Sequence, residues 1–506
     1  MTRFSFILLT IISSAIVICC KHNKSVESYT INKIAVLPVS SVNQDTFCMH
    51  IGKGLTYDLI SRLSCQKELS VRSFGSVKNI DINALEHSEL RNILDIEYLV
   101  EGKYRIDNDS LILNLKLTHF PEGNEIHKKN IISPMDSLSS LPGIVAKELV
   151  SEMRIKPDPA VRKISSAAAS ADPEAYRLYL KAVGSSPETA GEWMEYIELL
   201  KKSIGKDPLF EPAWTSLGHA CLEYSGLVGA EKGLYSEAEE NLLKALEINK
   251  ESPDAAYYLA SLYAKTGRSE LSLETFLTWS LNYAGYSRFF SGLGYINRYA
   301  GKMDESIEAY IKSQLLDSSL ANLVSSQMQI LKSQIYMGNY AGAASSFEAV
   351  CNNLDKLDKK PDEKQLFYAG VINMYKKDTL EAIQLFDSAV IVKPLSVWTK
   401  FGQAYKAALT GNIVELAVLT HELESRDIMD GERRYRMVHF YTFAEKKREA
   451  LEHLMLSVEK GFFNYPYIIS DPLTMNLRLD EEFKNIAESA KRRFEKFDQK
   501  HRNIRN

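Results

Sequence analysis

Few residues in this chain have the types and the spacing that catalysis requires. His421 and Glu422 are adjacent, as in a zinc-peptidase helix, but no second histidine follows at the required position. The glycine pairs at 52/54 and 292/294 do not lie between a strand and a helix, so no phosphate-binding loop is expected. No GxSxG segment presents a nucleophilic serine. The sequence therefore predicts a protein that is not an enzyme and has no cofactor or metal.

Composition indicates an ordered protein of several domains. The chain has 506 residues, of which 45% are apolar and 25% charged, with a formal net charge of −4. This balance gives no general attraction to nucleic acid, and no nucleic-acid partner is expected. The last fifteen residues are locally basic, which is typical of a solvated terminal helix that runs into a frayed tail.

The first twenty residues differ from the rest of the chain. An uncharged run from Phe4 to Cys20 lies between Arg3 and Lys21, which is typical of a signal peptide or a membrane anchor. Three alternatives remain open: a lipoprotein signal with Cys19 or Cys20 acylated, an uncleaved signal anchor, and plain secretion. Each of them would place the rest of the chain outside the cytoplasm, on the periplasmic side of a bacterial envelope.

The other four cysteines are expected to be reduced and buried. If residues 48–64 form a helix, a rise of about 1.5 Å per residue separates Cys48 and Cys65 beyond disulfide reach. Cys221 and Cys351 fall in segments that are not neighbours. No CxxC or Cys/His pattern suggests zinc.

Residues 30–155 have the pattern of a small α/β domain. Apolar β-branched runs at 31–41 and 69–77 predict strands, and amphipathic segments at 45–65 and 83–94 predict helices. Residues 97–132 alternate with turns at 107–110 and 121–124, which predicts three antiparallel strands, and a helix over 140–153 closes the segment. The expected order is β-α-β-α-β-β-β-α, a mixed sheet that carries helices.

The strand "IAVLPV", the helix "GKGLTYDLISRL", the strand "LSVRSF" and the segment "IEYLVEGKYRIDNDSLILNLKL" are similar to the TolB amino-terminal-like domain. This resemblance implies an α/β fold found in bacterial envelope proteins, and it brings no catalytic residues with it. The β-propeller of TolB is absent, so TolB's own partners are not carried over.

A small-residue linker at 156–172 leads to a segment with an internal repeat. One small or apolar position recurs at Ala238, Ser272 and Ser306 in steps of 34, and then after 37, 39, 34 and 34 residues, at Ala343, Ala382, Leu416 and Ala450. A fixed period of this length indicates helix pairs, each of which buries its apolar side only when the next pair stacks on it. We therefore expect an all-α superhelical solenoid over residues 173–460.

The motifs in each period are similar to the tetratricopeptide repeat family. The packing positions that carry this resemblance are Trp214, Leu217, Gly218, Ala238, Leu259, Tyr263, Gly267, Leu293, Gly294, Gly301, Ala343, Phe347, Ala382, Phe386 and Ala450. Residues 461–506, with "DPLTMNLRLDEEF", resemble the close of tetratricopeptide proteins that carry a TolB-like domain, and they are expected to form a capping helix and a basic tail.

The resemblance also implies a concave groove lined by the first helix of each pair. Counting from the signature aromatic places there His219, Asp254, Tyr257, Arg288, Tyr295, Arg298, Met328, Lys332, Phe367, Met374, Trp398, Phe401, Tyr405, Tyr435 and His439. Basic side chains beside aromatic rings are suited to a peptide that carries acidic groups.

Two functions are compatible with these patterns. The first is a non-enzymatic, membrane-attached scaffold or adaptor of the bacterial envelope that binds a protein or peptide in the concave groove. The second is a sensor in which the TolB-like domain binds a small molecule or an envelope polymer and the repeats relay that state. The partner and the oligomeric state are left open by the sequence.

Overall fold

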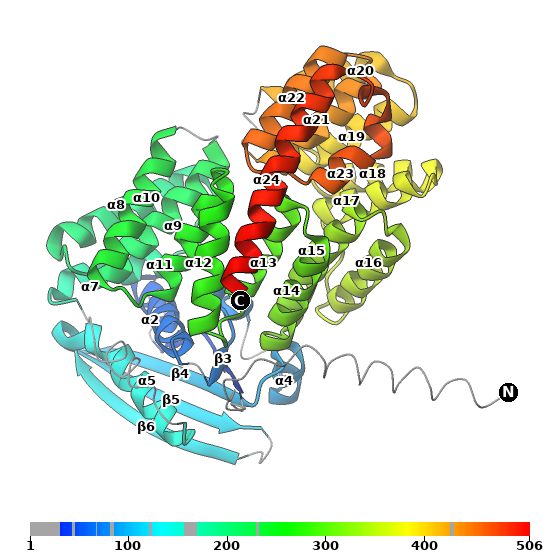
Figure 1. The fold of residues 1–506 in the computed structure, drawn as a ribbon. Helices are drawn as coiled ribbons and strands as arrows, with labels where there is room; N and C mark the ends of the chain where they lie inside the picture. Colours follow the sequence, from blue (N-terminus) through cyan, green and yellow to red (C-terminus); the bar gives the residue numbers. More distant parts are fainter. Residues whose placement is uncertain are drawn as a thin grey trace. The chain divides into compact units, whose positions relative to one another are not determined.

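The computed structural model describes residues 31–42, 46–66, 68–80, 85–120, 124–155, 170–228, 232–425 and 430–505. Residues 32–506 form one compact unit (Figure 1). The predicted order, an α/β domain followed by a long series of helix pairs, is confirmed. The predicted leader at 1–20, with Cys19 and Cys20, lies outside the described residues, and the division at 155, 172 and 460 stays a prediction.

The described part of the α/β domain contains one mixed sheet. Its strands are β1 (Asn32–Val36), β2 (Ser40–Ser41), β3 (Leu69–Val71), β4 (Tyr98–Asp107), β5 (Ser110–His119) and β6 (Asn124–Pro134). The order is β3-β1-β4-β5-β6, with β2 also paired to β4. The β1 pairings with β3 and β4 are parallel, whereas β4, β5 and β6 form an antiparallel meander. Asn108 adopts a positive φ in the turn between β4 and β5, a conformation that asparagine tolerates.

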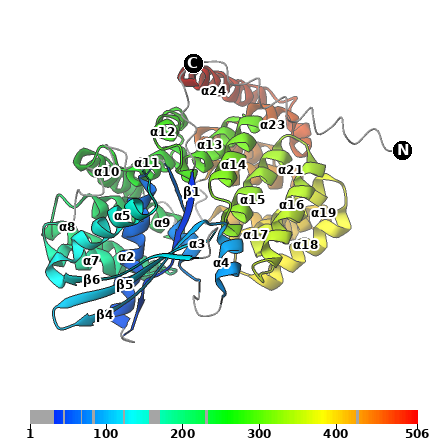
Figure 2. The same cartoon turned by 90° about the horizontal axis from the view of Figure 1, so that it is seen from below.

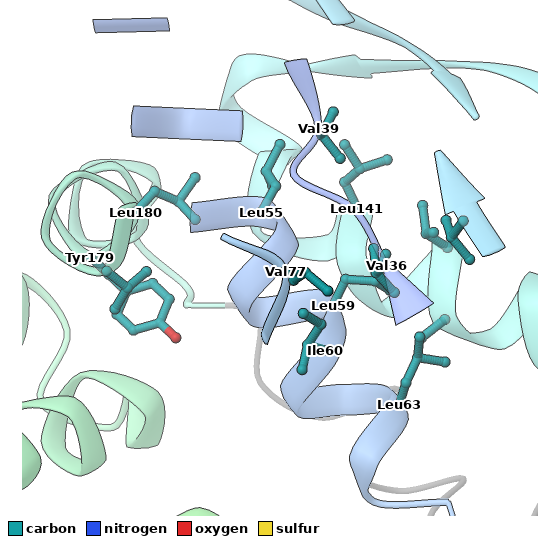
Figure 3. Close-up of a cluster of buried hydrophobic side chains, with 14 of the residues drawn as sticks. Val36, Val39, Leu55, Leu59, Ile60, Leu63, Val77, Leu141, Tyr179 and Leu180 are labelled. Carbon is teal, nitrogen blue, oxygen red and sulfur yellow. The ribbon is translucent and has the colours of Figure 1, made fainter. Parts of the chain in front are cut away.

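The helices of this domain are α2 (Thr46–Ser64), α3 (Phe74–Val77), α4 (His87–Leu94), η1 (Met135–Ser140) and α5 (Leu141–Glu152). Helices α2 and α5 pack against each other and enclose the apolar core with β1 (Figure 3). The strand predicted over 69–77 is wrong after residue 71. Ser73 caps a short helix there, because its side chain accepts a hydrogen bond from the Ser76 amide at 3.3 Å.

The first repeat helix packs directly on the α/β domain. Helix α7 (Pro173–Gly184) lies against α2, and Figure 3 shows Leu180 beside Leu55. A methyl group at Gly54 would lie 2.7 Å from the Leu180 carbonyl oxygen, so the glycine permits this close contact. Gly54 therefore serves helix packing.

The helices then alternate as first and second members of successive pairs. The early ones are α8 (Ala190–Lys206), α9 (Glu211–Val228), α10 (Lys232–Ile248), α11 (Pro253–Lys265), α12 (Ser269–Asn282), α13 (Ser287–Ala300) and α14 (Met303–Leu316). The later ones are α15 (Leu320–Tyr336), α16 (Tyr340–Asp355), α17 (Glu363–Tyr375), α18 (Thr379–Val392), α19 (Val397–Leu409), α20 (Ile413–Glu424), α21 (Gly431–Phe443) and α22 (Lys447–Glu459).

The recurring small position lies on the second helix of each pair. Its seven occupants, Ala238, Ser272, Ser306, Ala343, Ala382, Leu416 and Ala450, are all 0% exposed. In the pair α13/α14, Ser306 donates a 2.7 Å hydrogen bond to the Gly294 carbonyl. Of the other signature residues, Trp214, Tyr263 and Phe347 are only half-buried. Gly267 and Gly301 adopt the positive φ that ends their first helices.

The carboxyl-terminal helices fold back onto earlier repeats. Helices α23 (Tyr465–Ser470) and η2 (Pro472–Leu477) precede α24 (Glu481–Arg505), which contacts α12, α13, α22 and α23. Arg493 of α24 donates to the Gly267 carbonyl at 2.9 Å and also to the Val458 carbonyl. The expected frayed basic tail is wrong, because α24 continues to Arg505 and its basic side chains pair with Glu270, Glu274 and Asp498.

The α/β domain also contacts the middle of the repeat series (Figure 2). Buried Arg72 donates to the Leu94 carbonyl at 2.6 Å and to the Leu316 carbonyl at 3.1 Å, and it lies 3.4 Å from Asp317. These groups tie β3 and α4 to the junction of α14 and α15. The domain thus contacts the array both at α7 and at this junction.

Candidate functional site: a cavity lined by the first helices

One cavity of about 450 Å³ is lined by side chains from seven successive first helices, α9, α11, α13, α15, α17, α19 and α21. A side chain that points inward from each first helix reaches the same space, because the pairs stack in register. Its volume is in the range of small-molecule sites, about 300–1,000 Å³. This cavity is the concave groove that the repeat pattern predicts.

The structure brings seven of the predicted groove residues to this cavity: His219, Tyr257, Arg288, Tyr295, Arg298, Lys332 and Trp398. That any of them binds a peptide stays a prediction. Asp254, Met328, Met374 and His439 are not among its lining residues. Phe367, Phe401, Tyr405 and Tyr435 are not among the lining residues, and each is at most 2% exposed. Their assignment to an open groove is wrong.

Two of these errors are slips of one position along a helix. On α17 the cavity is lined by Tyr368, next to Phe367, and on α21 it is lined by Arg436, next to Tyr435. One position turns a side chain by about 100° around the helix axis, from the cavity into the interface between helices.

The assignment of Tyr405 to the groove is wrong for another reason. It lies two helical turns from Trp398, on the same side of α19, but its hydroxyl contacts the His439 Nδ1 at 2.6 Å. His439 in turn contacts Asp471 at 2.7 Å, and all three side chains are buried. The cap that follows the last pair therefore covers this end of α19.

The sequence interpretation missed further lining residues of the basic and aromatic kind and the carboxylates. They are Tyr258, Lys265, Phe276, Tyr299, Tyr310, Lys364, Tyr368, Arg433 and Arg436, with Glu223, Asp430 and Glu432. A signal for part of this set is the segment "GERRYR" at 431–436, where two arginines three apart share one helix face. The acidic pair stands at the start of α21, where carboxylates suit a helix amino terminus.

Glu432 is the internal partner of the basic residues in the middle of the cavity. It accepts a hydrogen bond from the Tyr336 hydroxyl at 2.6 Å and lies 3.3 Å from Arg298 and 3.6 Å from Lys332. Burial opposes its ionisation, but Arg298, Lys332 and Arg436 together hold the pKa of Glu432 well below its usual range. Two basic groups predicted to meet an acidic partner are thus already paired within the chain.

Asp430 forms a second contact of this kind. Its carboxylate accepts from the Tyr299 hydroxyl at 2.6 Å and from the Tyr295 hydroxyl at 3.5 Å, and it also caps α21 through the Arg433 amide. The start of α21 therefore binds the inner faces of α13 and α15.

The other end of the cavity contains a cation stacked on aromatic rings. Arg288 lies 3.9 Å from the Tyr257 ring centroid and forms a 3.0 Å ion pair with Asp254. Asp254 also accepts a 2.8 Å hydrogen bond from Ser61 of α2. His219 is stacked on Tyr258 with 4.2 Å between centroids, and burial lowers the pKa of His219 to about 4, so the ring is neutral.

A second cavity of about 420 Å³ lies between the α/β domain and the repeats. Tyr57 and Phe74 line one side of it, and Trp193, Tyr196 and Tyr258 line the other. Both parts of the chain are needed to form it.

The described residues contain no group of three histidine, cysteine, aspartate or glutamate side chains that could hold a metal ion. Within the same part of the chain, no helix has the length and the apolar content needed to cross a bilayer. The described cysteines, Cys65, Cys221 and Cys351, are free thiols, and Cys351 is only half-buried.

No protein-family model and no curated protein sequence matches the chain. Among solved structures, Pseudomonas aeruginosa pilF is 18% identical, with 43% of this chain and 91% of that chain covered and a TM-score of 0.33. Yeast Tom70 is 15% identical over 61% of this chain and 68% of that chain, with a TM-score of 0.38. TolB from Acinetobacter baumannii is 16% identical over 26% of this chain and 30% of that chain, with a TM-score of 0.19. Likeness at this level assigns no function, and the TolB resemblance stays a prediction.

Proposed function

We propose that this chain is a scaffold that holds partner proteins at a membrane of the bacterial envelope and performs no reaction itself. The support is the architecture, because stacked helix pairs offer an extended surface to a partner. In the concave groove, Asp430 and Glu432 at the start of α21 already contact α13 and α15, so we place the docking surface on the outer side of the array.

The observation that carries this proposal is an apolar row on α18 and α20. Leu380 is 70% exposed and Val414 is 78% exposed, and they occupy equivalent places 34 residues apart. The same place holds Glu270 in α12, Asp304 in α14 and Arg448 in α22. A charged residue is therefore compatible with the fold at this position, and the two apolar exceptions need a functional reason.

The row extends along both helices. Ile391, 83% exposed, follows Leu380 by eleven positions and so lies on the same face of α18, and Val418, 64% exposed, follows Val414 by one helical turn. Two neighbouring apolar stripes of this kind fit the apolar face of an amphipathic helix in a partner protein.

The test is the double variant Leu380→Glu/Val414→Glu. We expect it to fold like the wild type and to lose its partner, since two charges would have to be buried in the contact. Quantitative mass spectrometry of proteins cross-linked to each variant in cells measures the loss.

The matched control is Leu281→Glu/Leu315→Glu, because these leucines are 74% and 72% exposed on α12 and α14. A partner retained by the wild type and the control but absent from the double variant supports the proposal. An unchanged set of partners, or loss of self-association alone, contradicts it.

Membrane attachment is a separate part of the proposal, supported by the apolar run from Phe4 to Cys20. Mass spectrometry of the mature amino terminus distinguishes its forms. Acylation of Cys19 or Cys20 means a lipoprotein, an intact Met1 means a signal anchor, and an unmodified new terminus means secretion.

The second candidate, a ligand-binding transducer, is favoured by the 420 Å³ cavity between Tyr57 of the α/β domain and Trp193 of the repeats. A ligand there would contact both parts at once, and so would stabilise their contact. Binding of such a ligand must be measured with the whole chain, since neither the α/β domain nor the repeats alone form the cavity.

A further inference from the structure

The cavity lined by the first helices contains more positive than negative charge in its α13–α21 half. Among the described residues, Arg298, Lys332, Lys364, Arg433 and Arg436 line this half together with the carboxylates of Asp430 and Glu432. Five cations against two anions leave an excess of three positive charges in a partly enclosed space. Such an excess is unfavourable unless solvent or a bound anion compensates it.

Three of the five cations have no carboxylate of their own. In the described part of the chain, none of Lys364, Arg433 and Arg436 has an acidic oxygen within ion-pair distance of its side chain, since Glu432 pairs with Arg298 and Lys332. Instead, the Lys364 ammonium lies 5.1 Å and the Arg433 guanidinium 5.2 Å from the centroid of Trp398. Lys332 lies 5.9 Å from the same centroid. Three cations thus lie within 6 Å of the centroid of one indole ring.

Buried donors in the cavity wall are also left without acceptors. Arg298 and Arg436 are 1% and 5% exposed, and the Nε–H of each has no hydrogen-bond partner among the described residues. An unpaired buried N–H costs free energy, so a native structure rarely keeps one without an unseen acceptor. Two such groups beside excess positive charge indicate that the acceptor is an anion.

The pKa values of the lysines agree with incomplete compensation. Burial, with Arg298 and Arg436, lowers the pKa of Lys332 to about 8, against the opposite effect of Glu432. Burial and the charge of Lys332 lower the pKa of Lys364 too. Burial is the main cause of both shifts, and the neighbouring positive charges add to it.

The size of the space limits what the anion is. The start of α21 already occupies the inner faces of α13 and α15 through Asp430 and Glu432. An extended acidic peptide would have to displace these contacts, whereas a small molecule fits the cavity of about 450 Å³ that remains.

We propose that this cavity binds a small organic polyanion, with phosphate or carboxylate groups held by Lys364, Arg433 and Arg436 and its body against Trp398 and Tyr368. Arginine binds both kinds of anion in bidentate fashion, and the rings provide an apolar surface for the remainder. The site is distinct from the docking row on α18 and α20 and does not depend on it.

Calorimetric titration of the full chain at low ionic strength tests the proposal, with pyrophosphate and citrate as separate probes. We expect one molecule per chain for at least one probe. Binding of pyrophosphate identifies a phosphate ligand, and binding of citrate alone identifies a carboxylate ligand. Titration of potassium chloride at matched ionic strength measures the heat that screening alone produces. If neither probe gives more binding heat than potassium chloride does, the proposal is overturned.

The informative variant is Lys364→Gln/Arg433→Gln, because these side chains can be removed without breaking an ion pair. Charge reversal at Arg298 or Lys332 would instead place a second carboxylate beside buried Glu432. Such a variant would lose stability, so a loss of binding could not be separated from a loss of folding. We expect the double variant to bind the probe roughly tenfold more weakly or worse, while its melting temperature without ligand equals or exceeds that of the wild type.

Lys360→Gln is the matched control, since Lys360 is exposed and does not line the cavity. Equal loss of binding in the control, or full binding by the double variant, contradicts the proposal. The Leu380→Glu/Val414→Glu variant should bind the probe like the wild type, so failure of this site and failure of the docking row are distinguishable.

Discussion

At the scale of single residues, the sequence predicted which kinds of side chain face the groove. It did not predict that two of the basic ones are buried and paired with a carboxylate. Arg298 and Lys332 face the cavity as predicted, yet each is nearly fully buried against Glu432. The partner carboxylate is 134 positions away from Arg298 in the chain. Only the stacking of the repeats brings them together, and a count within one repeat contains no information on such a distant contact.

The lowered pKa of Lys332 makes stability depend on pH. Between about pH 8 and 10.5 the unfolded chain binds a proton at Lys332 that the folded chain has released, so the free energy of unfolding rises with pH. A shift of this size corresponds to roughly 3 kcal/mol over the whole window. In Lys332→Met this contribution is absent, and the variant should be the more stable protein at pH 7.

Urea unfolding of the wild type and Lys332→Met at several pH values measures this effect. The difference between the two proteins should shrink as the pH rises from 7.5 to 10, because other titrating groups contribute to both. A difference that does not change with pH would show that Lys332 titrates normally in the folded protein.

At the scale of elements, local patterns predicted most helices and strands because each has its own periodicity. The 34-residue step placed the seven stacking residues on second helices, where all are buried. The pattern failed where a few side-chain contacts decide, as at Ser73, whose cap converts the end of a predicted strand into a turn of helix. It also placed Phe367 and Tyr435 in the groove, whereas the side chains that line the cavity are one position further along each helix, at Tyr368 and Arg436.

Helix packing within a pair can be tested at Gly294 of α13. A methyl group there would lie 2.6 Å from the Tyr310 ring of α14, closer than atoms can approach, so the two helices would have to separate. We expect Gly294→Ala to lower the free energy of unfolding by about 1–3 kcal/mol.

Gly205→Ala is the matched control, because a methyl group at this position in α8 meets nothing within 4 Å. This change should raise stability by up to about 1 kcal/mol, since alanine reduces the freedom of the unfolded chain. Thermal or urea unfolding measures both variants. Equal effects at the two glycines would mean that the α13/α14 contact is not tight.

At the scale of the whole molecule, contacts between distant repeats are what the sequence did not predict. A linear stack of helix pairs joins only neighbours, and its stability is a sum of neighbour terms. Here α24 contacts both α12 and α22, α21 contacts α13 and α15, and the α/β domain contacts α7 and the α14–α15 junction. The basic residues near the carboxyl terminus, which look solvated in the sequence, make several of these contacts.

Arg493 allows this long-range coupling to be tested with one substitution. Its guanidinium donates to the Gly267 carbonyl beside α12 and to the Val458 carbonyl in α22, so Arg493→Gln removes both bonds at once. We expect a loss of about 2 kcal/mol and faster amide hydrogen exchange at the ends of α12 and α22 together. Arg492→Gln, at an exposed neighbouring position, should change neither. If exchange increased in α22 alone, the repeats would behave as an open stack, and α24 would be a cap on the last pair instead of a link between the third and the eighth.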